Sequence, residues 1–294
     1  MNGVGAWDVA AVIVKAILYA ATAMAAGGSW FLAYSGSLVA EAARPRMRQI
    51  AAAAAALGVA SSLLRIPLLA GSMTGGFAGM FDGGLIAMIW NAGEARSTGT
   101  RLLGLTLLAV ALTLPRGSRI WSVLAALVAA TSFAWIGHAH ALRPNVLPTV
   151  LVAVHGVCVC FWLGALPPLL LMTHSAAAPE LGRVARRFGA IALGVVGILL
   201  AAGAGLLCLL LASTAALWDS PYGVALLCKL GLVCSLLGLG ALNKWRLTPR
   251  LLAADPSAVA ALRRSIILEM ILGAAILLTT ATLTTLLGPA RLAS

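Results

Sequence analysis

Eight long apolar runs, separated by short polar segments, account for most of the chain. A membrane-spanning helix needs about 20 mostly apolar residues, and this length criterion places the runs at 8–35, 50–71, 97–114, 120–139, 148–173, 188–213, 222–243 and 264–287. The stretch 72–96 begins Gly-rich and continues as an apolar piece too short to span, so we expect an external loop followed by an interfacial or re-entrant helix. The pattern predicts an all-α, polytopic integral membrane protein, a bundle of about eight transmembrane helices.

Basic residues are concentrated in alternate loops of this pattern. Thirteen of the twenty lysines and arginines follow the first, third, fifth and seventh runs: Arg44, Arg46, Arg48, Arg116, Arg119, Arg183, Arg186, Arg187, Lys244, Arg246, Arg250, Arg263 and Arg264. Positive charge holds short loops in the cytoplasm, so these loops are expected inside. An even number of spans then places both termini on the periplasmic or extracellular side.

Composition agrees with a membrane protein and argues against several other classes. The chain is 62% hydrophobic and only 10% charged, whereas about a quarter of a soluble domain is charged. No polar block is long enough to fold separately, so residues 1–294 are expected to form a single transmembrane domain. The net charge of +12 follows from loop orientation and requires no nucleic acid. The absence of Walker, HExxH and nucleophile-elbow motifs predicts no enzymatic activity.

Histidines gather on the predicted external side. His138 and His140 end the fourth run, and His155 lies about two turns into the fifth. Because these runs are antiparallel with a short connection, the three rings could converge. Imidazole suits copper, and sulfur ligands select its reduced form. The sulfur-bearing candidates in this layer are Met73, Met80, Met88 and, one turn from His155, Cys158.

A plainer interpretation stays open for part of this set. A histidine at a helix end is often a solvated interfacial residue, which applies to His140 and to His174, and scattered methionines are often filler. An ionisable residue inside a membrane run is a functional hypothesis by default. His155 is therefore the strongest candidate of the group.

Intramembrane charges form a second group. Lys15, Arg65, Arg101 and Lys229 each lie within about two turns of the external end of their run, while Glu269 is expected near the cytoplasmic end of the last run. The basic side chains either snorkel outward or point inward and pair with acids of the same side, which are Asp8, Asp82, Glu94 and Asp219. Pointing inward, they would repel a metal ion and favour carboxylates or phosphates, which keeps a haem alternative open.

Several segments resemble the CopD-type copper resistance and copper transport family. The segment 262–289 has the family's early acidic residue, following glycine and Thr-rich tail, and 221–251 has its lysine-bearing helix leading into an Asn-basic-aromatic-basic-Leu-x-Pro sequence. GHA at 137–139 and HGVCVCFWLGAL at 155–166 are similar to its GHA turn and its His-then-Trp-Leu-Gly helix, and TGTRLLGL at 98–105 to its Thr-Gly-to-Arg segment. CFWLGALPP departs from the double glycine that commonly follows Trp-Leu in the family.

The resemblance implies a multi-pass protein of the bacterial inner membrane that imports or transfers copper ions from the periplasmic side. It implies a periplasmic CopC-type copper-binding protein as partner. Functional positions carried over by motif are His138, His155, Lys229 and Glu269, with metal ligation assigned to the histidines alone. Two alternatives remain: a membrane redox protein in which His138 and His155 are axial ligands of haem b and the basic layer holds the propionates, and a copper sensor or assembly factor that transports nothing.

Overall fold

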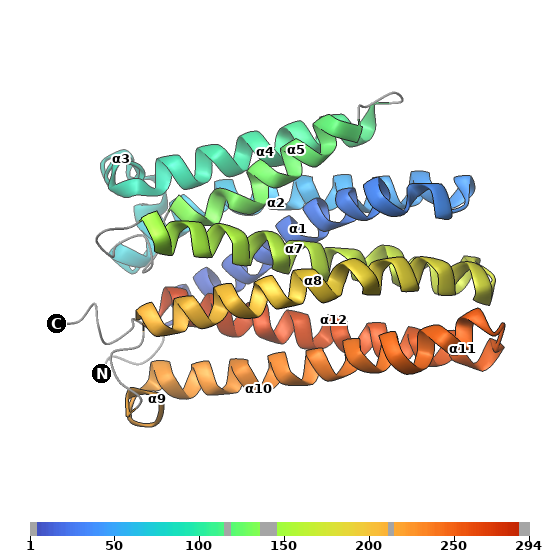
Figure 1. Cartoon of the computed structure of the whole chain (residues 1–294). Coiled ribbons are helices and arrows are strands. Elements are labelled where there is room, and N and C mark those ends of the chain that lie inside the picture. The colour runs from blue at the N-terminus through green and yellow to red at the C-terminus, as the bar shows by residue number, and fades with distance from the viewer. Residues whose placement is uncertain (1–4, 115–118, 136–145, 211–214, 288–294) are drawn as a thin grey trace.

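A computed structural model of the chain describes residues 5–114, 119–135, 146–210 and 215–287. Long helices lie side by side and alternate in direction, and a few short helices cap the ends of the bundle (Figure 1). The described elements are α1 (Ala6–Ser35), η1 (Gly36–Leu38), η2 (Glu41–Ala43), α2 (Arg44–Thr74), η3 (Phe77–Phe81), α3 (Gly83–Ile89), η4 (Trp90–Glu94), α4 (Ala95–Thr113), α5 (Arg119–Thr131), η5 (Ser132–Trp135), α7 (Val146–Ser175), α8 (Ala178–Leu210), α9 (Ala216–Asp219), α10 (Pro221–Leu242), η6 (Asn243–Leu247), α11 (Thr248–Leu252) and α12 (Pro256–Thr285). The predicted all-α class is confirmed.

All eight predicted runs contain a helix, but they differ in length. Six helical segments in the described ranges are long and apolar enough to cross a membrane: Ala6–Leu38, Glu41–Thr74, Val146–Ser175, Ala178–Leu210, Pro221–Leu252 and Pro256–Thr285. The segment Arg119–Trp135 is apolar but shorter, and α4 carries Arg96 and Arg101. Helix α8 begins ten residues, and α12 eight residues, before the predicted runs, because polar first turns extend a helix without registering as apolar.

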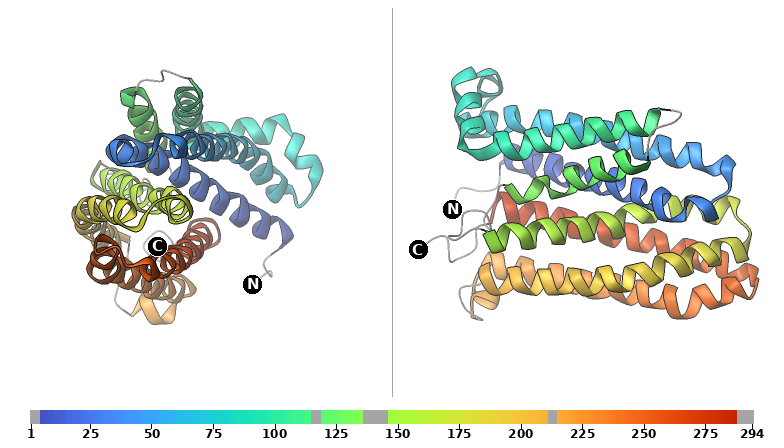
Figure 2. Two further views of the ribbon diagram at one scale, coloured as in Figure 1. Left: turned by 90° about the vertical axis from the view of Figure 1, so that its right-hand side faces the viewer. Right: turned by 45° about the horizontal axis from the view of Figure 1, so that its top comes forward.

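The long helices form two groups that share α1. Helices α1, α2, α4 and α5 meet around small side chains, chiefly alanines such as Ala55 and Ala126. Helices α7, α8 and α12 enclose larger side chains, including Met172, Leu181 and Ile266. Helix α1 contacts α2, α5, α7 and α12, so it joins the two groups, as the end-on view shows (Figure 2).

Two glycines bring α1 and α7 into direct backbone contact. A Cβ built on Gly27 would lie 2.0 Å from the carbonyl oxygen of Cys160, and one on Gly164 would lie 2.1 Å from that of Ala23. Neither position has room for a side chain. Small residues at helix crossings let backbones approach closely in lipid, and here they set the depth and rotation of α7 against α1.

The segment 72–96 folds into short helices at one end of the bundle. Gly75, with φ 70°, ends α2 in the left-handed conformation that favours glycine. The Asp82 carboxylate accepts hydrogen bonds from the backbone N–H groups of Gly84 and Leu85 and so begins α3. Helix α3 runs across the bundle end (Figure 2). The predicted short helix is confirmed, and its placement at a membrane interface stays a prediction.

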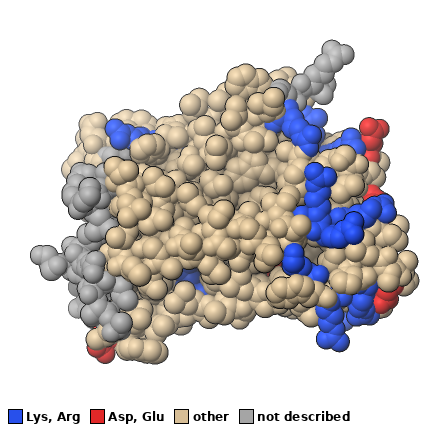
Figure 3. All heavy atoms as spheres, viewed as in Figure 1, with Lys and Arg blue, Asp and Glu red and all other residues tan. Residues whose placement is uncertain are grey.

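Basic side chains gather at the opposite end of the bundle. Figure 3 shows lysines and arginines concentrated where α7 joins α8 and where α11 joins α12. They include Arg183, Arg187, Arg246 and Arg250, and two acids, Glu41 and Asp255, lie at the same end. Of the thirteen basic residues predicted to share a side, Arg116 lies outside the described residues. The charge asymmetry expected from the loops is thus present along the long axis.

Candidate functional site

His155 lies on α7 with its ring against α8. Its Nδ1 is buried and has no hydrogen-bond partner within the described ranges. A Cβ at Gly203 would be 3.6 Å from the ring carbon Cε1, so the ring lies where α8 presents no side chain. A buried polar atom without a partner costs free energy, and a bound ligand would remove that cost. His155 therefore offers one imidazole nitrogen for coordination.

The other two predicted external histidines, His138 and His140, lie outside the described residues. The element before them, η5, ends at Trp135 and packs against α7, the helix that carries His155. The chain thus leaves toward His138 from the neighbourhood of α7. Convergence of the three rings stays a prediction.

Predicted sulfur ligands are spread over this end of the molecule. Met73, at the end of α2, is 60% exposed, and Met88, on α3, is 49% exposed. Met80 lies over Gly71, whereas Cys158 is buried on α7. Among the residues that the structure describes, no three His, Cys, Asp or Glu side chains come close enough to hold a metal ion. A sulfur-containing site around His155 stays a prediction.

One face of α7 carries several polar or sulfur-bearing side chains. Cys158 and Trp162 follow His155 at spacings of three and seven residues, which place the three on the same side of a helix. Lys229 of α10 lies close enough to His155 to act on it electrostatically. The sequence pattern groups Lys229 with three other cations, whereas in the structure its charge acts on His155.

The face continues to Glu269, which is 2% exposed on α12. Its Oε2 accepts a hydrogen bond from Trp162 Nε1 at 3.2 Å, and its Oε1 accepts one from Asn243 Nδ2. Asn243 begins the π-helical turn η6, and Thr248 Oγ1 donates to its carbonyl at 2.8 Å. Such turns are frequent at functional sites. Donors from two other elements thus hold a buried carboxylate.

The position of Glu269 within its helix differs from the expected one. It was expected near the cytoplasmic end of the last run, but it is the fourteenth of thirty residues in α12 and lies near the helix middle. The reason is the polar first turns of α12, which start at Pro256 and move the helix centre. Trp162 and Asn243 were not predicted as site residues. Both lie in segments that resemble the CopD-type family, and this resemblance was the signal in the sequence that could have identified them as site residues.

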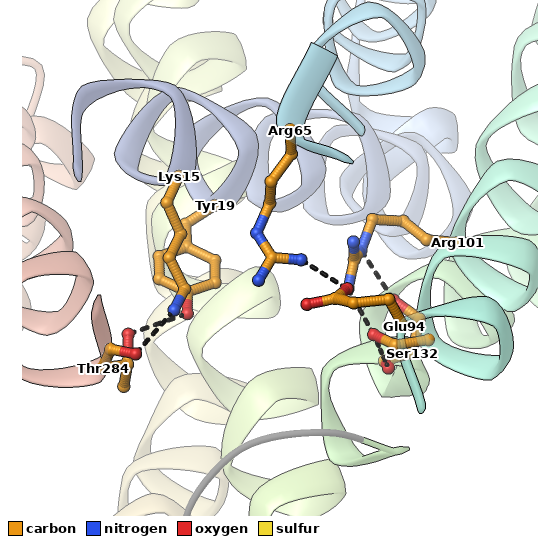
Figure 4. A network of polar contacts seen from close by, with 8 residues as sticks. Lys15, Tyr19, Arg65, Glu94, Arg101, Ser132 and Thr284 are labelled. Carbon is orange, nitrogen blue, oxygen red and sulfur yellow. Dashed lines mark hydrogen bonds and ion pairs between the residues drawn. The ribbon is translucent and has the colours of Figure 1, made fainter. Parts of the chain in front are cut away.

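The remaining predicted cations meet at the end of the bundle that holds α3 (Figure 4). Arg65 of α2 forms an ion pair with Glu94, Nη1 to Oε2 at 2.5 Å. Lys15 Nζ on α1 donates to the carbonyl oxygen of Thr284 at 3.0 Å. In this view the Arg65 side chain lies between Lys15 and Arg101. The inward arrangement, rather than outward snorkelling, describes this group.

Arg101 is the most deeply buried member of the group, at 1% exposure. Its Nε donates to Ser132 Oγ at 3.1 Å and its Nη2 to Ser97 Oγ at 2.7 Å. The guanidinium carbon lies 4.3 Å from the centroid of the Phe133 ring, a cation–π distance. These contacts are neutral, so they orient the charge without compensating it.

Three of the four acids expected to pair with these cations make other contacts or lie exposed. Asp8 accepts from the backbone N–H of Gly5 at 3.0 Å, Asp82 caps α3, and Asp219 is exposed at the end of α9. In the described part of the chain, Glu94 alone of the four forms an ion pair with a basic side chain.

Comparison with known proteins gives two matches to family models. Residues 182–283 match the model described as copper resistance protein D. Residues 6–143 match the model described as copper resistance protein D-like, N-terminal domain. No curated protein and no solved structure matches the chain. The interval between the matches contains α7, the helix that carries His155.

Proposed function

Because the chain belongs to the copper resistance protein D family, we propose that it transfers copper ions from the end of the bundle near His155 toward the middle of the membrane. The single observation that supports this most is the buried Nδ1 of His155, which has no hydrogen-bond partner among the residues that the structure describes and lies on a helix long enough to span. Neutral imidazole is a common copper ligand. We propose His138, His140 and one of Met73 or Met80 as its companions.

The inward route follows the polar face of α7. Cys158, one turn from His155, supplies a sulfur atom, and Trp162, one turn further, donates to Glu269. The Glu269 carboxylate lies near the middle of α12. Ionisable residues inside a membrane-spanning helix mark ion pathways in membrane proteins. Copper is the substrate of this route.

We also propose the topology in which this transfer works. The chain would form one domain of eight crossings in a bacterial inner membrane, with its basic end in the cytoplasm and both termini outside. The positions of Arg183, Arg187, Arg246 and Arg250 at one end of the bundle support this orientation. Copper would reach the outer end from a periplasmic CopC-type carrier.

Metal analysis and a visible spectrum of one purified sample test the proposal. We expect bound copper, no Soret band, and at least a tenfold loss of copper affinity in His155→Ala, because one ligand is removed. His174→Ala is the matched control: this histidine lies at the basic end of α7 and its ring contacts the carbonyl oxygen of Leu170. Helix content by circular dichroism should not change in either variant.

Two results would contradict the proposal. A Soret band that disappears in His155→Ala would favour the haem alternative. Copper binding of equal affinity in His155→Ala and in the unchanged chain would move the site away from α7.

A further inference from the structure

The charges of the cluster at the α3 end do not balance. The chain has eight acidic residues in all, and the structure describes every one of them. Glu41, Glu180 and Asp255 lie at the basic end, Glu269 lies near the middle of α12, and Asp8, Asp82 and Asp219 lie on the surface at the ends of short or terminal segments. Glu94 is thus the one side-chain carboxylate beside Lys15, Arg65 and Arg101, and two of the three basic side chains have no side-chain carboxylate to pair with.

Hydrogen bonding in the cluster is also incomplete. Arg101 Nη1 is buried and has no partner among the described residues. Arg65 donates to Glu94 and, in the described part, to no other group, although a guanidinium has several further N–H donors. Lys15 donates to the carbonyl of Thr284. Both the charge and the donors therefore call for an acceptor that the described residues do not supply, since an uncompensated buried cation is costly.

We propose that this cluster binds a phosphate-type oxyanion, supplied either as free phosphate or as the headgroup phosphate of an anionic lipid. Guanidinium groups bind such oxyanions through paired N–H donors, and Arg65 lies between Lys15 and Arg101 (Figure 4). Free phosphate as a dianion would match the two basic side chains that lack a carboxylate, and a lipid phosphodiester, which carries one negative charge, would match one of them. A copper ion would be repelled, so this site is separate from the route along α7.

The depth of the cluster suits either source of phosphate. Lys15 lies nine residues after the start of α1, or about 14 Å along the axis at 1.5 Å per residue. Helix α1 is some 15 Å longer than the hydrocarbon layer of about 30 Å, so with this surplus shared between its two ends Lys15 lies about 6 Å inside the hydrocarbon edge. A lysine side chain reaches from there toward the headgroup layer, where lipid phosphates and dissolved phosphate both occur.

Native mass spectrometry of the full-length chain in a neutral detergent, after removal of lipid, tests the site. Inorganic phosphate and phosphatidylglycerol are added separately, and we expect one equivalent of at least one of them to bind. Lys15→Gln and Arg101→Gln should each weaken that binding by at least tenfold. Arg264→Gln, which removes an exposed charge from α12 outside the cluster, should have no effect.

The two additions distinguish the sources: binding of phosphatidylglycerol alone identifies a lipid site, and binding of phosphate a site for the free ion. Lys15→Gln keeps the test valid if Arg101→Gln does not fold, because Lys15 contacts a backbone carbonyl alone among the described groups. If neither probe binds, or if all variants bind equally, the proposal is wrong. Copper affinity should be the same in Lys15→Gln as in the unchanged chain, so the result is independent of the site at His155.

Discussion

Glu269 and Arg101 are both almost fully buried, yet their surroundings differ. Both carboxylate oxygens of Glu269 accept hydrogen bonds from neutral donors, on Trp162 and Asn243. Arg101 donates to hydroxyl groups, lies against an aromatic ring and has one nitrogen with no partner in the described part of the chain. A buried group with satisfied hydrogen bonds is stable as it stands, whereas one with an unused donor is suited to a ligand. The two residues therefore support different proposals.

Replacing Glu269 with glutamine should separate copper binding from copper transfer. The glutamine oxygen can still accept from Trp162 Nε1, and its NH2 can donate to Asn243 Oδ1, which has no partner among the described residues, once the Asn243 amide turns over. The hydrogen bonds are thus kept while the negative charge is lost. We expect a nearly unchanged Tm in detergent and slower copper uptake into proteoliposomes, with copper affinity at His155 unchanged. Glu41→Gln, at a side chain that is 91% exposed, is the control. If uptake is unchanged, Glu269 has no part in the route.

At the scale of elements, close helix contacts and caps determine the geometry around the site. The Gly27–Gly164 crossing fixes α7 against α1, and α7 carries His155, Cys158 and Trp162 along one face. Helix α12 begins at the Asp255 cap, which sets the depth of Glu269. Neither contact touches the proposed substrate, but both position the residues that do.

Adding a methyl group at the crossing should loosen the bundle. In Gly27→Ala the new Cβ would lie 2.0 Å from a backbone oxygen of α7, and overpacking of this kind costs about 1–3 kcal/mol. Gly231→Ala on α10 is the matched control, since nothing lies within 4 Å of the added atom and alanine favours helix formation. Thermal unfolding in detergent should show a lower Tm for Gly27→Ala and an equal or higher one for Gly231→Ala. The reverse order would contradict the backbone contact.

The α12 cap should make stability depend on pH. Hydrogen bonds from Ser257, followed by those from Arg250, lower the pKa of the Asp255 carboxyl below its ordinary value of 3.8. The ionised form is thus favoured by folding, and its contribution is present above the ordinary value and lost as the pH falls through the lowered one. Asp255→Ala should lower Tm by a few degrees at neutral pH, and the difference should vanish in strong acid. An equal difference at all pH values would show that the charge is irrelevant.

At the scale of the whole molecule, the charge asymmetry and the two polar clusters share one axis. The basic side chains lie at one end (Figure 3), and the cation cluster with Glu94 lies toward the other. His155 lies nine residues into α7 from that second end, and Glu269 lies at mid-length of α12. A substrate that entered near His155 would therefore pass from the end that holds the cation cluster toward the end where the loop lysines and arginines gather.

Reporter fusions test this orientation. A reporter active only in the cytoplasm should work when fused after Arg187 or Arg250 and fail at the C-terminus, because positive charge holds those two loops inside. A matched periplasmic reporter should give the opposite pattern. A C-terminal fusion active in the cytoplasm would overturn the even number of crossings.

The sequence by itself determined the helical class, the approximate positions of the helices and the end at which positive charge collects. These follow from composition over local windows, since about 20 apolar residues suffice for a span. Helix ends were less well predicted, because the polar turns that begin α8 and α12 carry no apolar signal. His155 was found because a single ionisable residue stands out in an apolar run.

Only the tertiary structure decided which buried polar side chains meet. Spacing places a residue on a face of its own helix, but the neighbour that it meets depends on the rotation and depth of that helix. Contacts such as that between Gly27 and Gly164 set these quantities, and they join segments far apart in the chain. For this reason Glu269 meets Asn243, and the charge of Lys229 acts on His155.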